Sequence, residues 1–226
     1  MLMSDKIVYK EVDGELVGEP SPSYEQELRK KQYDINLSRS GIPKKYWNVS
    51  LRQYSSYSPS MGKVLRYIQA AQRANYNFSN LYLYGKEKSS KTLIACLIGK
   101  EFIKYGHKVK FLLADDLTDL LLKNYGFDAP RKDEQNDLLK LDLLILDGAF
   151  EVEKSALWKS SSRNIINSSW YNILRKLSDK NIRIVITSST LPNYIQNEYG
   201  SSLQNLLNEF LLLPFENEQD DGGKNV

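Results

Sequence analysis

Short apolar runs alternate along the chain with longer segments in which apolar residues recur every three or four positions. The short runs predict buried strands, and the longer segments predict helices that pack on them. Strands that alternate with helices favour a parallel sheet with right-handed crossovers, so we predict an α/β fold with a central parallel sheet. The strands are expected at 81–84, 109–113, 141–147 and 182–187, with a last apolar run at 210–215, and the main helices at 60–75, 91–105, 117–125 and 163–178.

The first forty residues have a different character from the rest of the chain, because they are polar and interrupted by glycine and proline. Residues 7–17 alternate apolar and polar positions around Asp13-Gly14, which predicts a small hairpin. Residues 24–40 are expected to form a charged helix or a mobile arm. We therefore divide the chain into a partner-binding extension (1–40), a core (41–215) and a disordered acidic tail (216–226).

The segment 81–93 reads Leu-Tyr-Leu-Tyr-Gly-Lys-Glu-Lys-Ser-Ser-Lys-Thr-Leu, and it is nearly a phosphate-binding P-loop. That motif needs a glycine, four further residues and then Gly-Lys-Ser/Thr. Gly85, Lys91 and Thr92 are in register, but Ser90 replaces the second glycine. The loop N–H groups and the helix N-terminus would hold the phosphates of ATP, Lys91 would reach the β- and γ-phosphates, and Thr92 would bind Mg²⁺.

Ser90 keeps its N–H but places a Cβ where glycine leaves room, so we expect weakened or reshaped ATP binding. Lys88 and Ser89 complete the loop, and the positive charge of Lys86 and Lys88 would offset part of this loss. The alternative is an ordinary lysine-rich turn between a strand and a helix. The helix that follows supports the P-loop, because one apolar face is formed by Ile94, Leu97, Ile98, Phe102 and Tyr105.

A second acidic position supports a nucleotide site. The apolar run at 141–147 ends in Asp147, as expected of a central strand that presents a carboxylate beside the phosphates. Asp147 would hold Mg²⁺ through water; alternatively, Asp147-Gly148 is a common turn pair. Many P-loop ATPases place a second acid directly afterwards, where this chain has Gly148. Glu151 would take that role if the backbone turned back, and otherwise it is a solvated loop residue.

Charge and composition exclude some classes of function and leave others open. The net charge is +3, and local groups such as Lys44-Lys45 and the lysines at 100, 104, 108 and 110 either contact a phosphate backbone or are solvated surface residues. One His and one Cys are too few for a typical zinc site, and Cys96 is expected to be a buried structural thiol. No apolar run reaches the length of a membrane span, so we expect a cytoplasmic protein without membrane contact.

The order of these elements resembles the DnaC/DnaI/IstB-type AAA+ ATPases, which include bacterial and phage helicase loaders. The resemblance covers roughly residues 40–215. Besides the P-loop it rests on Ile42-Pro43-Lys44-Lys45-Tyr46-Trp47, on 143–147 as the Walker B strand, on the strand 182–189 as the sensor strand, and on Tyr199-Gly200-Ser201-Ser202-Leu203 as the start of the closing helix. It implies a three-layer P-loop NTPase fold of the AAA+ type.

The departures from the family pattern all concern catalysis. Ser189 stands where the family's sensor strand usually ends in Asn, and Asn205 stands where the closing helix usually carries an arginine finger. An arginine finger is worth about 10³ or more in turnover. Arg163 would serve in its place, or it contacts solvent or phosphate instead. Together with Ser90 and Gly148 these departures predict a protein that binds ATP and is at most a weak ATPase.

The resemblance implies a role in DNA replication. The extension would bind a replicative hexameric helicase, the core would bind single-stranded DNA, and ATP would shape a ring or spiral homo-oligomer. Three alternatives stay open: a transposition helper or initiation scaffold of the IstB kind, an interaction domain with a vestigial P-loop, and a small-molecule kinase. We rank the kinase lowest, because Arg131 is the only arginine in the polar segment 126–140.

Overall fold

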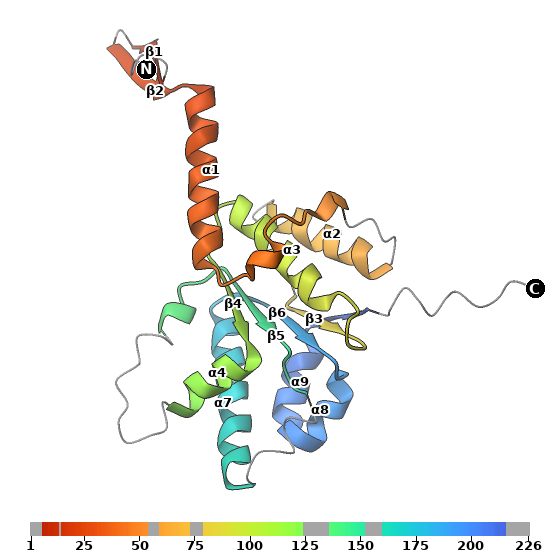
Figure 1. Cartoon of the computed structure of the whole chain (residues 1–226). Coiled ribbons are helices and arrows are strands. Elements are labelled where there is room, and N and C mark those ends of the chain that lie inside the picture. Colours follow the sequence, from red (N-terminus) through yellow and green to blue (C-terminus); the bar gives the residue numbers. More distant parts are fainter. Residues whose placement is uncertain are drawn as a thin grey trace, which may run out of the picture.

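The computed structural model describes residues 6–13, 15–53, 59–72, 79–123, 136–151 and 160–215. Five strands form one parallel sheet in the order β4-β5-β6-β3-β7, so their carboxyl ends share one edge (Figure 1). Among these residues, no helix is both long and apolar enough to cross a membrane. The strands are β3 (Leu81–Tyr84), β4 (Val109–Leu113), β5 (Leu143–Asp147), β6 (Arg183–Ser188) and β7 (Leu211–Pro214).

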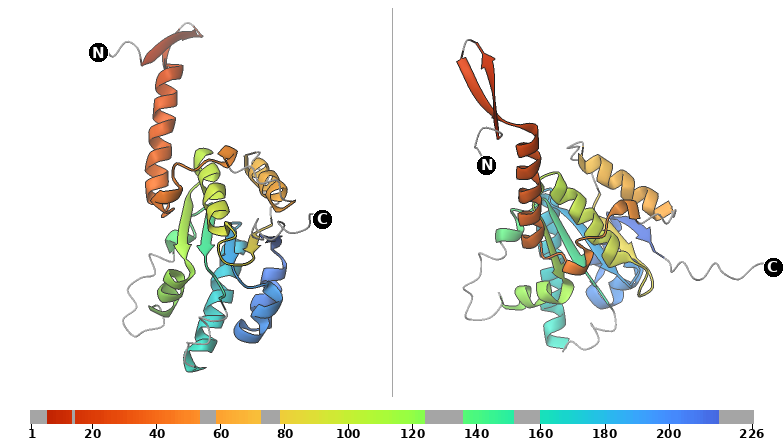
Figure 2. Two further views of the ribbon diagram at one scale, coloured as in Figure 1. Left: turned by 45° about the vertical axis from the view of Figure 1, so that its right-hand side comes forward. Right: turned by 45° about the horizontal axis from the view of Figure 1, so that its top comes forward.

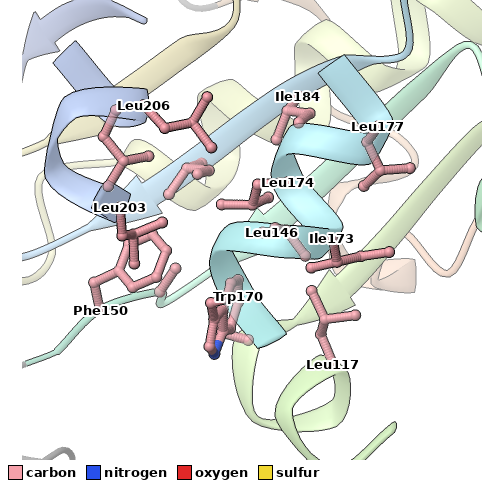
Figure 3. Packing of buried hydrophobic residues seen from close by; sticks show 14 of the residues in the cluster. Leu117, Leu146, Phe150, Trp170, Ile173, Leu174, Leu177, Ile184, Leu203 and Leu206 are labelled. Carbon is pink, nitrogen blue, oxygen red and sulfur yellow. The ribbon is translucent and has the colours of Figure 1, made fainter. Parts of the chain in front are cut away.

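Helices cover both faces of this sheet, which confirms the three-layer prediction. One face is covered by α2 (Pro59–Gln72), α3 (Lys91–Lys104) and the end of α1 (Pro22–Arg39), and the other by α4 (Ala114–Lys123), α7 (Ser160–Asp179), α8 (Pro192–Tyr199) and α9 (Ser201–Asn208). Alternate strand residues feed the two hydrophobic clusters, with Leu143 and Ile145 on one face and Leu144 and Leu146 on the other. Figure 3 shows the second cluster around Trp170.

Several predicted boundaries and faces need correction. Helix α4 begins at Ala114 and not at 117, because Asp115 and Asp116 favour the positive N-terminal turn of a helix. Helix α7 begins at Ser160, three residues before the predicted start at 163. Tyr105 was predicted on the apolar face of the P-loop helix, but it follows the last residue of α3 and is 44% exposed.

Lys100 is not a surface lysine, although the sequence grouped it with lysines able to contact DNA. Its side chain is buried, and Nζ donates hydrogen bonds to the carbonyl oxygens of Tyr46 (3.0 Å), Trp47 (2.5 Å) and Val49. Burial lowers the pKa of Lys100 from its ordinary value, against the opposing effect of Glu101. The ammonium therefore satisfies the carbonyl groups around the short 3₁₀ helix η2 (Lys44–Tyr46) and fixes this segment to the P-loop helix.

The extension consists of a hairpin at the tip of a helix. Strands β1 (Ile7–Val12) and β2 (Glu15–Pro20) pair in antiparallel register, and Asp13 in the turn has φ 52°, as hairpin turns of this length require. Ser21 caps α1 by accepting a hydrogen bond from the Tyr24 N–H. Figures 1 and 2 show α1 standing away from the body with the hairpin at its far end.

The root of α1 is part of the core face even though it lies inside the predicted extension. Leu37 and Ser40 are buried, and the Ser40 carbonyl accepts the Phe111 N–H of β4 at 2.7 Å. Gly41 follows with φ 80°, and a Cβ there would lie 2.7 Å from the Phe111 oxygen. The predicted boundary at residue 40 therefore coincides with the end of α1 but not with a gap in the packing.

The last strand fits against the start of the P-loop. The Phe215 N–H donates to the Tyr84 carbonyl at 2.7 Å, and Ser60 Oγ of α2 donates to the Pro214 carbonyl at 2.6 Å. A Cβ on Gly85, where φ is 144°, would lie 1.9 Å from the Phe215 carbonyl oxygen. Glycine is therefore required at position 85 by backbone packing, independently of any phosphate.

We predict that Gly85→Ala lowers the free energy of unfolding by more than about 3 kcal/mol, because the Phe215 backbone must move and β7 must separate from β3. Gly62→Ala is the matched control, since Gly62 lies within α2 with nothing within 4 Å of the added carbon. That change should raise stability by about 0.5–1 kcal/mol through helix propensity. Urea unfolding of both variants measures the difference, and a Gly85→Ala protein as stable as the wild type would contradict the packing argument.

Candidate nucleotide-binding site

Asp147 lies at the centre of the site, at the carboxyl end of β5. Its Oδ1 accepts a hydrogen bond from Thr92 Oγ1 at 2.7 Å and another from Thr187 Oγ1 at 2.6 Å. Thr92 belongs to the first turn of α3 and Thr187 belongs to β6. This oxygen therefore connects the end of β5 to both α3 and β6. The structure thus brings together Thr92 and Asp147, which the sequence predicted as the residues that hold Mg²⁺.

Lys91 points into the loop that precedes it. Its Nζ donates to the carbonyl oxygens of Gly85 (2.8 Å) and Lys86 (2.6 Å) and to Ser89 Oγ (3.0 Å). Burial lowers the pKa of Lys91 from its ordinary value, while the carboxylates of Asp147, Glu151 and Glu87 act in the opposite direction. An ammonium surrounded by oxygen atoms at the N-terminus of a helix is the arrangement expected of a P-loop lysine.

The backbone of the loop is held in conformations that glycine adopts more easily. Ser90 has φ 64° and ψ 10°, and Lys88 has φ 62°, so two non-glycine residues are left-handed within three positions. A non-glycine residue in this region costs roughly 1–2 kcal/mol. Ser90 is the N-cap residue of α3, and its side chain makes no capping hydrogen bond. Ser90 therefore adopts a backbone conformation that is strained for serine but would be free of strain for the glycine of the motif.

The chain turns back directly after Asp147. The Gly148 N–H donates to Thr187 Oγ1 at 3.0 Å, and the Ala149 N–H donates to the Thr187 carbonyl at 2.9 Å. Phe150 then enters the second hydrophobic cluster with an edge-on ring contact to Trp170 (Figure 3). Its ring makes a second edge-on contact with Tyr199. This anchor leaves Glu151 half-buried, with Oε1 3.6 Å from the place that a Cβ on Gly148 would occupy.

Glu151 therefore lies close to the position that a side chain at residue 148 would occupy, and its role as a second acid stays a prediction. Its negative charge also reaches Lys91, because it opposes the downward shift of the lysine pKa. The backbone reversal depends on left-handed conformations at Gly148 (φ 70°) and Phe150 (φ 58°). The sequence pattern gave no sign of the second of these, because an aromatic residue rarely adopts a positive φ.

Of the other predicted catalytic residues, the structure describes the side chain of Ser189 but not that of Arg163. Ser189 is exposed and lines a shallow hollow with Leu191, Tyr194 and Asn197. Asn205, at the arginine-finger position, is exposed on α9. Arg163 belongs to α7, but its side chain lies outside the described residues. The roles of Ser189 and Arg163 thus stay predictions.

Thr187 is a site residue that the sequence reasoning missed. It is 2% exposed, and its hydroxyl both donates to Asp147 and accepts from Gly148. A threonine near the end of a fully buried strand needs a hydrogen-bond partner, and this need was the available signal. Thr187 lies on β6, two residues before Ser189.

The residues present fit a magnesium nucleotide. Mg²⁺ prefers oxygen ligands, and it is commonly held by one or two protein groups together with phosphates and water. Thr92 and Asp147 supply a hydroxyl and a carboxylate oxygen 2.7 Å apart at the carboxyl edge of the sheet, directly beside the loop lysine. Within the described residues no cluster of three or more His, Cys, Asp or Glu forms an all-protein metal site.

Comparison with known proteins identifies the family. The model of the family described as IstB-like ATP binding protein matches residues 21–196. A comparison with curated proteins finds no match.

Solved structures of replication proteins share the fold. The DnaC helicase loader is 19% identical with a TM-score of 0.61, over 76% of this chain and 99% of that chain. DnaI is 18% identical with a TM-score of 0.60, over 78% and 94%. DnaA bound to AMPPCP and single-stranded DNA is 18% identical with a TM-score of 0.62, over 79% and 52%, so the chain spans about half the length of this initiator. The chain therefore belongs to the IstB-like ATP-binding protein family and has the AAA+ P-loop fold of these replication proteins.

Proposed function

We propose that this protein is a helicase-loader-like component of DNA replication that uses ATP as a binding switch and hydrolyses it weakly or not at all. The observation that carries the proposal is the convergence of Lys91, Thr92 and Asp147 at the carboxyl edge of the sheet, with Thr187 holding Asp147 in place. Ligands of parallel α/β sheets bind at this edge. The fold similarity to DnaC and DnaI supports the loader-like role.

Each site residue has a separate task in nucleotide binding. The loop N–H groups of 85–90 and the N-terminus of α3 attract the phosphates, and Lys91 exchanges its loop oxygens for phosphate oxygens. Thr92 offers its hydroxyl to Mg²⁺, and Asp147 orients that hydroxyl or a water molecule of the ion. Bound Mg²⁺ would neutralise phosphate charge. Thr187 fixes the Asp147 carboxylate from β6, so that the site does not depend on a single element.

Weak hydrolysis follows from what surrounds this cluster. Gly148 carries no acid, and Asn205 offers no positive charge to a neighbouring phosphate. Glu151 is the candidate general base, because the turn after Asp147 places it beside Gly148. A glutamate on a loop four residues beyond the strand end is held less rigidly than an acid directly after it. We therefore assign Glu151 a residual rather than an efficient catalytic role.

The proposed partners are a replicative hexameric helicase and single-stranded DNA. The projecting extension offers exposed surface to the helicase, while the core offers the exposed residues Lys104, Tyr105 and Lys108 at the end of α3 and just after it. Lysines beside an exposed aromatic ring suit a flexible, unstacked strand. Self-assembly into a ring or spiral would let the nucleotide set the geometry of the complex, and it remains part of this proposal.

A transposition helper or initiation scaffold is the second candidate, and the family match favours it. Such a protein would use the same nucleotide site but would bind duplex DNA without affinity for a helicase. The two candidates therefore share every prediction about the P-loop and differ only in the partner.

We predict that Lys91→Ala abolishes binding of a fluorescent ATP analogue with Mg²⁺, whereas the wild type binds in the micromolar range. The physical reason is the loss of the Lys91 ammonium, which donates to three oxygen atoms of the loop. Lys88→Ala is the control, because Lys88 is exposed on the same loop and should change the affinity only a few-fold. Equal affinities of wild type and Lys91→Ala would show that the P-loop is vestigial.

Steady-state turnover should be far below that of ordinary AAA+ ATPases, and Glu151→Gln should remove most of what remains while leaving ATP affinity within about twofold. The amide keeps the shape of the side chain but does not accept a proton. Phosphate release under saturating ATP gives the turnover, and titration with the fluorescent ATP analogue gives the affinity. Rapid turnover that disappears in Lys91→Ala but persists in Glu151→Gln would overturn the assignment of weak hydrolysis and of Glu151 together.

Ser90→Gly should stabilise the protein by about 1 kcal/mol and tighten ATP binding, because glycine adopts the observed left-handed backbone without strain. Ser89→Gly is the matched control: Ser89 is buried, and its hydroxyl accepts a hydrogen bond from Lys91, so the same change one residue earlier should destabilise. Thermal unfolding and nucleotide titration of the two variants test this directly. A Ser90→Gly protein less stable than wild type would show that the serine side chain contributes more than its strain removes.

A further inference from the structure

The hairpin β1–β2 exposes more apolar side chains than its position in the fold explains. Half of its twelve strand residues are large hydrophobics that are exposed: Ile7, Val8, Tyr9, Val12, Leu16 and Val17. Tyr9 is 66% exposed and Leu16 is 75% exposed. An isolated two-stranded hairpin is marginally stable in water, and it gains stability when a further surface covers it. The hairpin therefore has the properties of an element that is completed by a partner.

One face of the hairpin is more apolar than the other. Cross-strand pairs place Ile7 opposite Pro20, Tyr9 opposite Gly18 and Glu11 opposite Leu16. Because side chains alternate between the two faces along a strand, these six residues share one face. The absent side chain of Gly18 lets Tyr9 and Ile7 lie across the strand, since a Cβ there would be 3.1 Å from Ile7 and 3.2 Å from Tyr9. The opposite face carries the Lys10–Glu19 ion pair between its valines.

Charge defines what kind of surface fits this face. Residues 7–20 contain one lysine and four acidic residues, a net charge of −3, whereas the whole chain carries +3. A phosphate backbone is repelled by such a hairpin, and a groove with a basic rim is attracted to it. The acidic residue on the apolar face is Glu11, directly opposite Leu16.

The helix beneath the hairpin points to a partner outside the ATPase core. An 18-residue helix is about 27 Å long, so α1 holds the hairpin well clear of the sheet (Figures 1 and 2). Leu28 and Ile35 are exposed and lie seven residues apart on one side of α1, opposite the side that buries Leu37. The family match begins at residue 21, directly after the hairpin.

From these observations we propose that the Ile7/Tyr9/Leu16 face of the hairpin docks into an apolar groove with a basic rim on the replicative hexameric helicase, and that Tyr9 and Leu16 are its anchors. This inference rests on the proposed function and identifies the part of the extension that makes the contact. Aromatic and large aliphatic side chains that become fully covered in a groove usually dominate such interfaces. The hairpin does not bind nucleic acid.

The test is surface-based binding of the hexameric helicase of the source organism to immobilised full-length protein, with ATP and Mg²⁺. The double variant Tyr9→Ser/Leu16→Ser should bind at least tenfold more weakly, and Glu11→Lys severalfold more weakly with less dependence on salt. The control Tyr194→Ser/Leu65→Ser removes one exposed tyrosine and one exposed leucine from the core and should stay within about twofold of wild type. Unchanged ATP affinity shows that the variants are folded.

The outcomes separate the two claims. If the wild type binds the helicase and the hairpin variants bind equally well, the hairpin assignment is overturned while the proposed function stands. If the wild type does not bind, the helicase-loader role fails and the docking assignment fails with it. Sedimentation of the proteins alone, and titration with single-stranded DNA, complete the set. A loss of self-association or of DNA binding confined to the hairpin variants would assign the face to a second copy or to nucleic acid, and would overturn this inference.

Discussion

Two hydroxyl groups donate to the same carboxylate oxygen of Asp147, and the whole candidate site depends on this shared acceptor. Thr92 brings the first turn of the P-loop helix to it, and Thr187 brings the end of β6. Parallel pairing makes this meeting possible, because it places the carboxyl ends of β3, β5 and β6 side by side. The backbone reversal after β5 depends on Thr187 as well, since the N–H groups of Gly148 and Ala149 both donate to it.

The parts of this arrangement that rest on periodicity were predictable from the sequence. Leucine- and isoleucine-rich runs gave every strand of the sheet, and a lysine and a threonine at fixed spacing from Gly85 gave the loop and the start of α3. Asp147 was predictable because an acid at the end of an apolar strand has few structural reasons to be there. Ends of helices were less predictable: α7 begins among serines that also suit a loop.

What the sequence concealed depends on single long-range contacts. Lys100 resembles its neighbours Lys104 and Lys108 in sequence, and only the three carbonyl groups of 46–49 explain why it is buried. Gly85 has two reasons to be glycine, and only the approach of Phe215 reveals the second. The left-handed backbone of Ser90 is likewise a property of the folded loop, since serine alone does not favour it. The position of Glu151 needed the Phe150 anchor.

The junction between α1 and the core has a consequence for the integrity of the sheet. Exposed edge strands readily pair with other chains, and proteins protect them with short strands, proline or covering segments. The β7 edge is four residues long and ends in Pro214, whereas at the β4 edge the Ser40 carbonyl takes up the Phe111 N–H and Gly41 packs against the Phe111 oxygen. The root of the extension thus covers the β4 edge and keeps it from pairing with other chains. A shortened chain that began at the core boundary near residue 41 would expose this edge, so a soluble core fragment needs the last turn of α1.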